Sequence, residues 1–339
     1  MSKLPAALAS LKFPVIGSPL FIISTPKLVI AQCINGVVGS MPALNARPVS
    51  QLDEWLAEIT EALAAHNKAH PDNPAAPYAI NQIVHKSNTR FDEDMAMCVK
   101  YKVPVIITSL GAREEINQAA HSYGGVVLHD IINNKFAHKA IEKGADGLVA
   151  VAAGAGGHAG VKSPFALVQE IRQWFDGPLA LSGSIASGSA ILGALAMGAD
   201  FAYIGSAFIA TEEARAAQEY KQSIVDSNSD DIVYRICSPV CMATTWLLPS
   251  AAPAWTPTTC PRATPARWTL VATSPKRGKT FGVVVKALVL STRSKVPPLL
   301  LRNSRRNTRQ PRRGCWLDRH CEGQCPEATQ TATSLRSSQ

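Results

Sequence analysis

A single histidine in this sequence lies inside a glycine-rich stretch, a combination typical of a loop that binds a ligand or performs catalysis. His158 belongs to the segment Ala153-Gly-Ala-Gly-Gly-His-Ala-Gly160, which directly follows an apolar run. Glycines there, Gly157 among them, permit positive φ and leave room for a flat ligand against the backbone. A histidine that packing does not require can titrate near neutrality, so we interpret His158 as the candidate general base.

Two further stretches have the composition of anion-binding turns. Ser182-Gly183-Ser184 and Gly205-Ser206 stand about 22 residues apart, and each lies between an apolar run and a helical pattern. Small residues before a helix let backbone N–H groups approach an anion, which the helix dipole also favours. Either stretch alone is equally well read as an ordinary turn. The two together, in this order, indicate a ligand that carries a phosphate.

The elements that must position these residues are short apolar runs separated by helical patterns. The runs are continuous rather than alternating, as strands that are buried on both faces require. One helical pattern places Leu52, Leu56, Ile59 and Leu63 on a single face, and Gly144 and Gly198 stand where two helices should end. The eight runs are 13–17, 36–41, 78–84, 103–108, 125–130, 147–152, 178–182 and 201–205.

Eight strands that alternate with helices predict a (β/α)8 barrel over about residues 11–230. A doubly wound open sheet is the rival architecture. It would normally carry a Gly-x-Gly-x-x-Gly turn after the first strand, and the sequence there reads Gly17-Ser-Pro-Leu-Phe-Ile. In a barrel, the loops after the strands meet at one face, and those after the seventh and eighth strands commonly hold phosphate.

The other residues of chemical interest have structural explanations. His138 stands on a helical pattern and is expected to be packed or exposed, and His66 and His70 fall in a connection expected to be solvated. Cys33 and Cys98 lie in helical patterns with no histidine nearby in the sequence, so we expect two buried thiols rather than nucleophiles.

Four ordered motifs resemble the nitronate monooxygenase family, formerly called 2-nitropropane dioxygenases. The resemblance extends from about residue 13 to about residue 230. The motifs are Ala155-Gly-Gly-His-Ala-Gly, Leu181-Ser-Gly-Ser-Ile-Ala-Ser-Gly, Ala194-Leu-Ala-Met-Gly-Ala-Asp, and Ile204-Gly-Ser-Ala-Phe with Ala210-Thr-Glu-Glu.

The resemblance implies an FMN-dependent TIM barrel that oxidises alkyl nitronates with O2 to carbonyl compounds and nitrite. His158 matches the family's histidine near the flavin. The residues that the resemblance places against the cofactor are Gly17, Ser18 and Asn81 beside the ring, and Gly183, Ser184, Gly205 and Ser206 at the phosphate, with Gly157 and Ser182 in the adjoining loops.

Two departures from the family pattern leave the substrate open. The family commonly has two glycines where Ser18 and Pro19 stand, and a lysine near the fifth strand, where this chain has His129 and Asp130. Lys162 or a helix dipole could replace that cation. A related branch uses the same barrel and FMN with a nicotinamide cofactor to reduce enoyl thioesters, and it remains an alternative, as does an inactive product.

Composition divides the chain into two parts. Residues 235–339 hold 17 of the 34 Lys and Arg but only 3 of the 25 Asp and Glu, a charge of +14, so residues 1–234 carry 17 minus 22, or −5. We therefore predict an FMN-binding catalytic domain at 1–234 and a basic tail at 235–339. The sequence shows no long apolar run and no secretory signal pattern, so we expect a cytoplasmic protein without membrane contact. The resemblance implies that it acts on a small nitro compound with O2. A homodimer is compatible with this composition.

Three interpretations of the tail compete. A nucleic-acid-binding arm would explain its arginines, but no aromatic residue lies between Arg302 and Arg313. A zinc site is not favoured because its spacings match no common finger; its candidate ligands are Cys315, His320, Cys321 and Cys325. We favour translation out of frame, because the segment is nearly free of acids, lacks periodicity and is rich in prolines that should exclude regular structure from 235–267.

Overall fold

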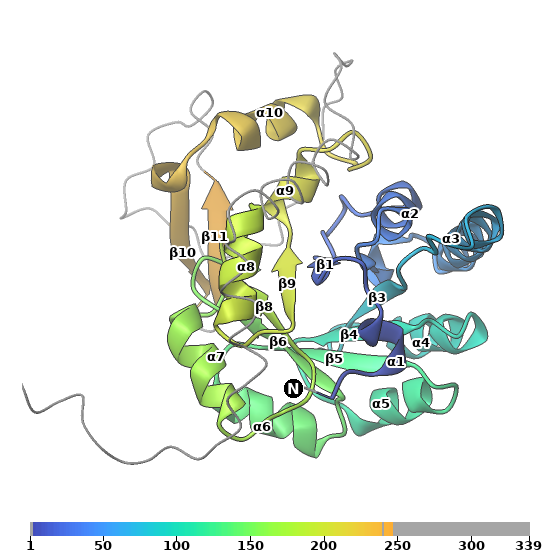
Figure 1. The fold of residues 1–339 in the computed structure, drawn as a ribbon, viewed down its shortest axis with the longest axis horizontal. Helices are drawn as coiled ribbons and strands as arrows, with labels where there is room; N and C mark the ends of the chain where they lie inside the picture. The colour runs from blue at the N-terminus through green and yellow to red at the C-terminus, as the bar shows by residue number, and fades with distance from the viewer. Residues whose placement is uncertain (1–2, 239–240, 247–339) are drawn as a thin grey trace, which may run out of the picture. The chain divides into compact units, whose positions relative to one another are not determined.

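The chain folds into a (β/α)8 barrel. The structure is a computed structural model, and it describes residues 3–238 and 241–246. Eight parallel strands form one sheet in the order β1-β9-β8-β6-β5-β4-β3-β2. A parallel bridge between Ile16 and Val38 joins the two ends of this order, so the barrel is nearly closed (Figure 1). The predicted fold class is confirmed.

The strands of the barrel coincide with the eight predicted apolar runs. They are β1 (Val15–Gly17), β2 (Gly39–Pro42), β3 (Tyr78–Ile83), β4 (Val105–Ser109), β5 (Val126–Ile131), β6 (Gly147–Val151), β8 (Leu179–Ser182) and β9 (Phe201–Ile204). The helices are α1 (Ala6–Ala9), α2 (Pro26–Ile34), α3 (Ser50–Ala69), α4 (Phe91–Lys100), α5 (Glu114–His121), α6 (Asn134–Glu142), α7 (Pro164–Arg172), α8 (Gly188–Ala196), α9 (Ser206–Ile209) and α10 (Gln218–Asp226), with 3-10 turns η1 (Ala43–Asn45) and η2 (Ser229–Asp231).

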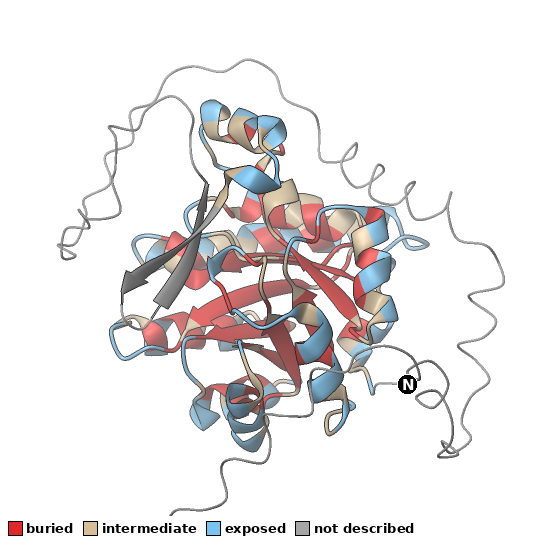
Figure 2. Ribbon diagram, turned by 90° about the vertical axis from the view of Figure 1, so that its left-hand side faces the viewer, coloured by how far each residue is buried: buried red, intermediate tan, exposed pale blue. Residues whose placement is uncertain are grey.

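The strands are buried on both faces, as their continuous apolar sequences require. Inward-facing side chains from successive strands fill the barrel, among them Ile16, Ile107 and Leu128, and Leu8 of α1 packs with them. Outward-facing side chains pack against the surrounding helices in a shell. Figure 2 shows the strands as buried and the outer faces of the helices as exposed.

Local signals in the sequence set the ends of several helices. The side chains of Asn133 and Ser187 accept hydrogen bonds from Phe136 N and Ala190 N and so cap α6 and α8. Gly144 and Gly198, with φ of 91° and 110°, follow the last turns of the same two helices in the left-handed conformation that favours glycine. Both glycines were predicted as helix ends.

A second, smaller sheet brings a segment from after the barrel next to the loop of His158. Strand β7 (Gly157–His158) pairs antiparallel with β11 (Cys241–Trp246), which pairs in turn with β10 (Ile232–Ser238). The register places Ala243 opposite His158.

The prediction that residues 235–267 hold no regular structure is therefore wrong at its beginning. Strand β10 passes through the predicted boundary at residue 234, and β11 ends at Trp246, before the proline that follows at 249. The prolines at 239 and 249 both stand outside the bounds of the two strands. The zinc candidates and the arginine run lie outside the described residues.

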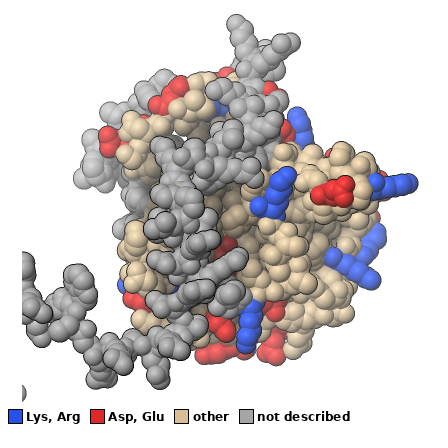
Figure 3. All heavy atoms as spheres, in the orientation of Figure 1, with Lys and Arg blue, Asp and Glu red and all other residues tan. Residues whose placement is uncertain are grey.

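The charged side chains of the described surface are mixed in sign. Figure 3 shows Lys and Arg interspersed with Asp and Glu over the visible described face. Within the described residues, no helix has both the length and the hydrophobicity that crossing a membrane requires.

Candidate functional site

The carboxyl ends of β1 and β9 meet at the mouth of the barrel. Ser18 N donates to Ile204 O at 2.8 Å. A Cβ added to Gly205 would lie 3.6 Å from Ser18 Cβ, so the two loops are in close approach. Gly17 is also held tightly, because a Cβ there would lie 2.3 Å from Nε2 of the buried Gln32. The candidates Gly17, Ser18, Gly205 and Ser206 therefore lie together, and Ser206 begins α9.

The loops that follow β6 and β8 pack directly against each other. Ser184 N and Ser184 Oγ both donate to Gly154 O, at 2.9 and 3.1 Å. Gly183 has φ of 152°, and a Cβ there would lie 2.7 Å from Ala153 O. Ser182 ends β8, next to these contacts. Since β6, β8, β9 and β1 are neighbours in the barrel, four loops with candidate residues adjoin one another at one rim.

A hydrogen-bonded chain crosses three neighbouring strands just below this rim. Asn81 of β3 donates from Nδ2 to Ser109 Oγ of β4 at 2.7 Å, and Ser109 Oγ donates to Asp130 Oδ2 of β5 at 2.5 Å. Each of these residues stands two positions after an inward-facing residue of its strand, so all three face the barrel interior. Asn81, predicted beside a flavin, thus belongs to a polar layer at the top of the barrel.

Asp130 has an unusual environment within this layer. Its Oδ1 atom is buried and has no hydrogen-bond partner. Burial raises the pKa of this carboxyl to about 6, and the hydrogen bond from Ser109 offsets part of the rise. The hydroxyl of Tyr203, on β9, is buried and unpaired as well. Burial first, and the Asp130 carboxylate second, hold the pKa of the Tyr203 phenol well above its ordinary value.

His129, the neighbour of Asp130, serves the shell between strands and helices. It contacts Thr108 Oγ1 through Nδ1 at 2.5 Å. Its side chain is 5% exposed, and burial lowers its pKa to about 4. The imidazole is therefore neutral at physiological pH and supplies no positive charge near this strand.

His158 is exposed and lies in β7, between Gly157, with φ of 67°, and the buried Ala159. Its backbone pairs with β11 rather than with a barrel strand. Strand β7 follows the β6 loop that contacts Ser184, so His158 lies in the same part of the rim as the glycine-rich candidates. The general-base assignment stays a prediction.

The other titratable candidates occupy structural positions, as predicted. His138 stacks on Trp174 with ring centroids 3.8 Å apart. Cys33 and Cys98 are fully buried, and burial raises the pKa of each thiol to about 12. His70 is exposed and His66 is half-buried; their rings stack on each other, and His66 lies within α3 rather than in a connection. Within residues 3–238 and 241–246, no three His, Cys, Asp or Glu side chains are placed to hold a metal ion.

Sequence reasoning missed Tyr203, and it noted Asp130 only as a departure from the pattern of relatives. A signal for both was present, because each is a polar group two residues after an inward-facing apolar residue on a strand. Ser109 comes directly after the fourth predicted run and is identifiable from the sequence as a strand-end residue, although no role follows for it there. The hydrogen bond between Ser109 and Asp130 depends on the register of β4 with β5, in which Thr108 stands opposite His129.

Solved structures of similar fold include two enzymes. FabK from Thermotoga maritima aligns with a TM-score of 0.62 and 23% identity, over 71% of this chain and 73% of that one. A nitroalkane oxidase from Streptomyces ansochromogenes aligns with a TM-score of 0.61 and 19% identity, over 71% of this chain and 79% of that one. At these identities the likeness concerns the fold.

Sequence relatives identify the family. A nitronate monooxygenase of Neurospora crassa is 32% identical over 130 residues, 35% of this chain and 34% of that protein. One from Paraburkholderia phytofirmans is 25% identical over 246 residues, 62% of this chain and 67% of that protein. The chain thus matches only a third of the length of the first of these relatives. The family model "Nitronate monooxygenase" matches residues 3–242, which is more than half of the chain. The protein therefore belongs to the nitronate monooxygenase family.

Proposed function

We propose that this chain binds FMN at the mouth of its barrel and oxidises alkyl nitronates with O2 to a carbonyl compound and nitrite. The observation that carries the proposal is the meeting of four strand ends at one rim, where Ser184 bonds to Gly154 and Ser18 lies against Gly205. Family membership supplies the chemistry. The flavin, when bound, supplies the electron transfer, and the protein supplies binding, orientation and electrostatics.

The residues at the rim fit a flavin nucleotide. Gly183 and Gly205 belong to loops that precede helices, and α8 is long enough for its dipole to favour a phosphate. Ser184 supports this loop through its bonds to Gly154, so we expect the phosphate to rely more on backbone groups near Gly183 and on Ser206. Gly17, Ser18, Asn81, Gly157 and Ser182 would then surround the ring.

His158 would orient or deprotonate the substrate. It is exposed at the rim, where a small molecule can reach it without a change of fold. A nitronate is already an anion, so His158 need only hold it. A neutral nitroalkane must lose its α-proton, and an imidazole can accept that proton as a general base.

The test of this function compares two reactions of the full-length protein reconstituted with FMN. We expect O2 uptake and nitrite release when a nitronate is added, with no requirement for a nicotinamide. Bleaching of the flavin by NADH in the absence of nitronate, without O2 uptake on nitronate addition, would instead favour the enoyl-thioester reductase alternative. A protein that retains no flavin absorbance would indicate an inactive product.

The tail and the setting of the enzyme are also proposals. We infer that residues 1–234 carry the catalytic domain and that the part of residues 235–339 beyond the family match, which ends at residue 242, results from translation out of frame. Reading the nucleotide sequence after codon 234 in the other two frames tests this, because a helical segment with balanced charge should appear in one of them. We expect a cytoplasmic protein without nucleic-acid partners, and the mass in solution would test for a homodimer.

A further inference from the structure

The polar chain at the top of the barrel has a direction, and it ends at an unpaired atom. Asn81 Nδ2 donates to Ser109 Oγ and to Ile107 O, and Ser109 Oγ donates to Asp130 Oδ2. The donors of the chain from Asn81 through Ser109 therefore point toward Asp130. Its other oxygen, Oδ1, is buried and has no hydrogen-bond partner among the described residues. An unmade hydrogen bond of this kind is costly, which indicates that a ligand completes it.

Other shielded aspartates of the described chain have a basic partner. Asp94 pairs with Arg90 at 2.8 Å, and Asp200 pairs with Arg172 at 2.6 Å. In the described residues, no Lys, Arg or His forms an ion pair with Asp130. Ser109, a neutral hydroxyl, is the partner of its carboxyl. A purely structural role would have called for a cation or a second donor, since a buried carboxylate is expensive when unpaired.

A second unpaired group faces the same interior from the other side of the barrel. Tyr203 OH, on β9, is buried without a partner, and its side chain belongs to the interior cluster. The Asp130 carboxylate is close enough to affect the titration of this phenol. A ligand that satisfies both groups must present hydrogen-bonding atoms on the edge that enters the barrel.

The flavin ring system has such an edge on one side only. Its pyrimidine half carries carbonyl oxygens and an N–H, whereas its dimethylbenzene half is apolar. We propose that Asp130, through Oδ1, is a positioning residue for the bound flavin, which holds the pyrimidine edge of the ring and places an acidic group beside it. This inference rests on the proposed function, because it requires that a flavin occupies the mouth.

An acidic group at this position has a consequence that a purely structural residue lacks. Reduced flavin carries more negative charge than oxidised flavin, so a neighbouring carboxylate weakens binding of the reduced form more than binding of the oxidised form. By thermodynamic linkage, it also lowers the reduction potential of the bound flavin. Asp130→Asn keeps an oxygen for the hydrogen bond from Ser109 and removes the charge.

The experiment measures binding of FMN to the full-length chain by fluorescence quenching, with oxidised FMN in air and with reduced FMN under anaerobic conditions. For Asp130→Asn we expect the ratio of the two dissociation constants to shift about tenfold in favour of reduced FMN. The potential of the bound flavin, measured against a reference dye, should rise accordingly. Neither readout depends on turnover.

Asp94→Asn is the matched control, because Asp94 is also a buried carboxyl with one unpaired oxygen, but it lies on α4 outside the barrel interior. We expect this variant to lose stability and to keep the wild-type binding ratio. An unchanged ratio in Asp130→Asn, or an equal shift in both variants, would overturn the inference while leaving the proposed function intact. A wild-type chain that binds no FMN would overturn the proposed function and the inference with it.

Discussion

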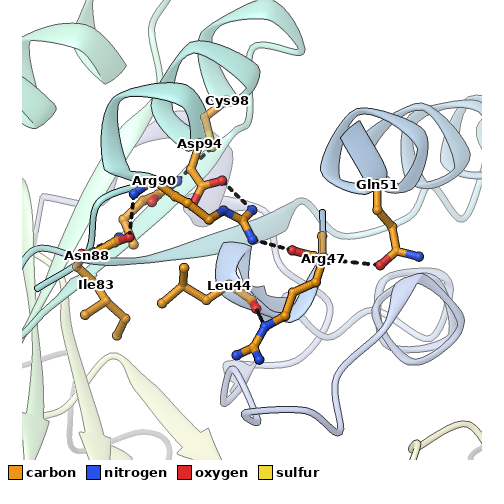
Figure 4. A network of polar contacts seen from close by, with 10 residues as sticks. Leu44, Arg47, Gln51, Ile83, Asn88, Arg90, Asp94 and Cys98 are labelled. Atoms are coloured by element: carbon orange, nitrogen blue, oxygen red, sulfur yellow. Dashed lines mark hydrogen bonds and ion pairs between the residues drawn. The ribbon is translucent and has the colours of Figure 1, made fainter. Parts of the chain in front are cut away.

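Two buried carboxyls show how differently the shell and the mouth of this barrel use polar groups. In the shell, Asp94 of α4 accepts a hydrogen bond from Arg90, whose other Nη donates to Ala46 O at 2.6 Å (Figure 4). These contacts tie the loop after β3 to the loop after β2. In the mouth, the carboxyl of Asp130 bonds to Ser109 alone within the described part of the chain, and its second oxygen is buried.

The electrostatics of the two sites differ in the same way. Burial raises the pKa of both carboxyls, but the Arg90 guanidinium offsets part of the rise at Asp94 through a hydrogen bond and its charge. At Asp130 the offset comes from one hydroxyl alone. The shell therefore pairs its carboxyl with a cation of the protein, whereas Asp130 in the mouth has no cationic partner among the described residues. Changes in the shell should affect stability, and changes in the mouth should affect chemistry.

The largest effect is expected at His158, in the mouth. His158→Ala should lower turnover of a neutral nitroalkane by about 10²–10⁴-fold, the usual contribution of a general base. Turnover of a pre-formed nitronate should fall much less, because no proton has to be removed. Steady-state O2 uptake with each substrate measures both values. Equal losses for the two substrates would contradict the base role.

A shell change should produce the opposite result. Asp94→Ala leaves the Arg90 guanidinium, whose side chain is 21% exposed, without its carboxylate. Breaking such a pair costs about 3 kcal/mol of unfolding free energy. Urea denaturation measures the loss. The binding of FMN should not change. A variant with wild-type stability but weakened flavin binding would contradict the assignment of Asp94 to a purely structural role.

Asp130→Asn should stabilise the protein above pH 6. In the unfolded chain an Asp carboxyl titrates near about 3.9, whereas burial raises the pKa of Asp130 to about 6. The folded state therefore binds the proton more tightly, and the wild type loses about 2–3 kcal/mol of stability as the pH rises through this window. Asn cannot ionise, so the variant should match the wild type near pH 4 and exceed it at pH 7.

His129 titrates in the same pH window and has the opposite effect on stability. Burial lowers its pKa to about 4, so its contribution to stability is lost as the pH falls from its ordinary value of 6.5 toward 4. This contribution is common to both proteins and cancels in their difference. A stability difference between wild type and Asp130→Asn that does not vary with pH would show that Asp130 is not an unpaired acid.

The smallest effect is expected within the loop after β6. Gly154 has φ of 90°, and a Cβ there would lie 2.4 Å from Ser184 Oγ, so Gly154→Ala should cost about 1–2 kcal/mol and weaken FMN binding. Gly156→Ala is the control, because nothing lies within 4 Å of a Cβ at that position. Thermal denaturation and FMN titration of both variants measure the difference, and equal effects would contradict the packing of this loop against Ser184.

Much of the fold could be predicted from the sequence because each strand is a short, continuous apolar run. The predicted run 201–205, for example, overlaps β9 (Phe201–Ile204), and Gly198 ends the preceding helix as expected. The positions of Gly183 and Gly205 after strands followed from the same periodicity. These features are local, so a window of the sequence contains all the information that they need.

The rest depends on contacts between distant segments. The bond from Ser109 to Asp130 requires the register of β4 with β5, which the barrel sets as a whole. The pairing of β7 with β11 joins Gly157 to Thr244, and no local pattern predicts it. Asp130 gave only a weak signal, because a polar residue at the end of a strand is common.

The most direct test of the central claim, that the mouth of this barrel holds a flavin nucleotide, is a titration of FMN into the full-length chain monitored by fluorescence, with Gly154→Ala and Asp94→Ala in parallel. The account predicts saturable binding of one FMN per chain, weakened by the change at Gly154 and unaffected by the change at Asp94. Absence of saturable binding, or equal weakening in both variants, would contradict it.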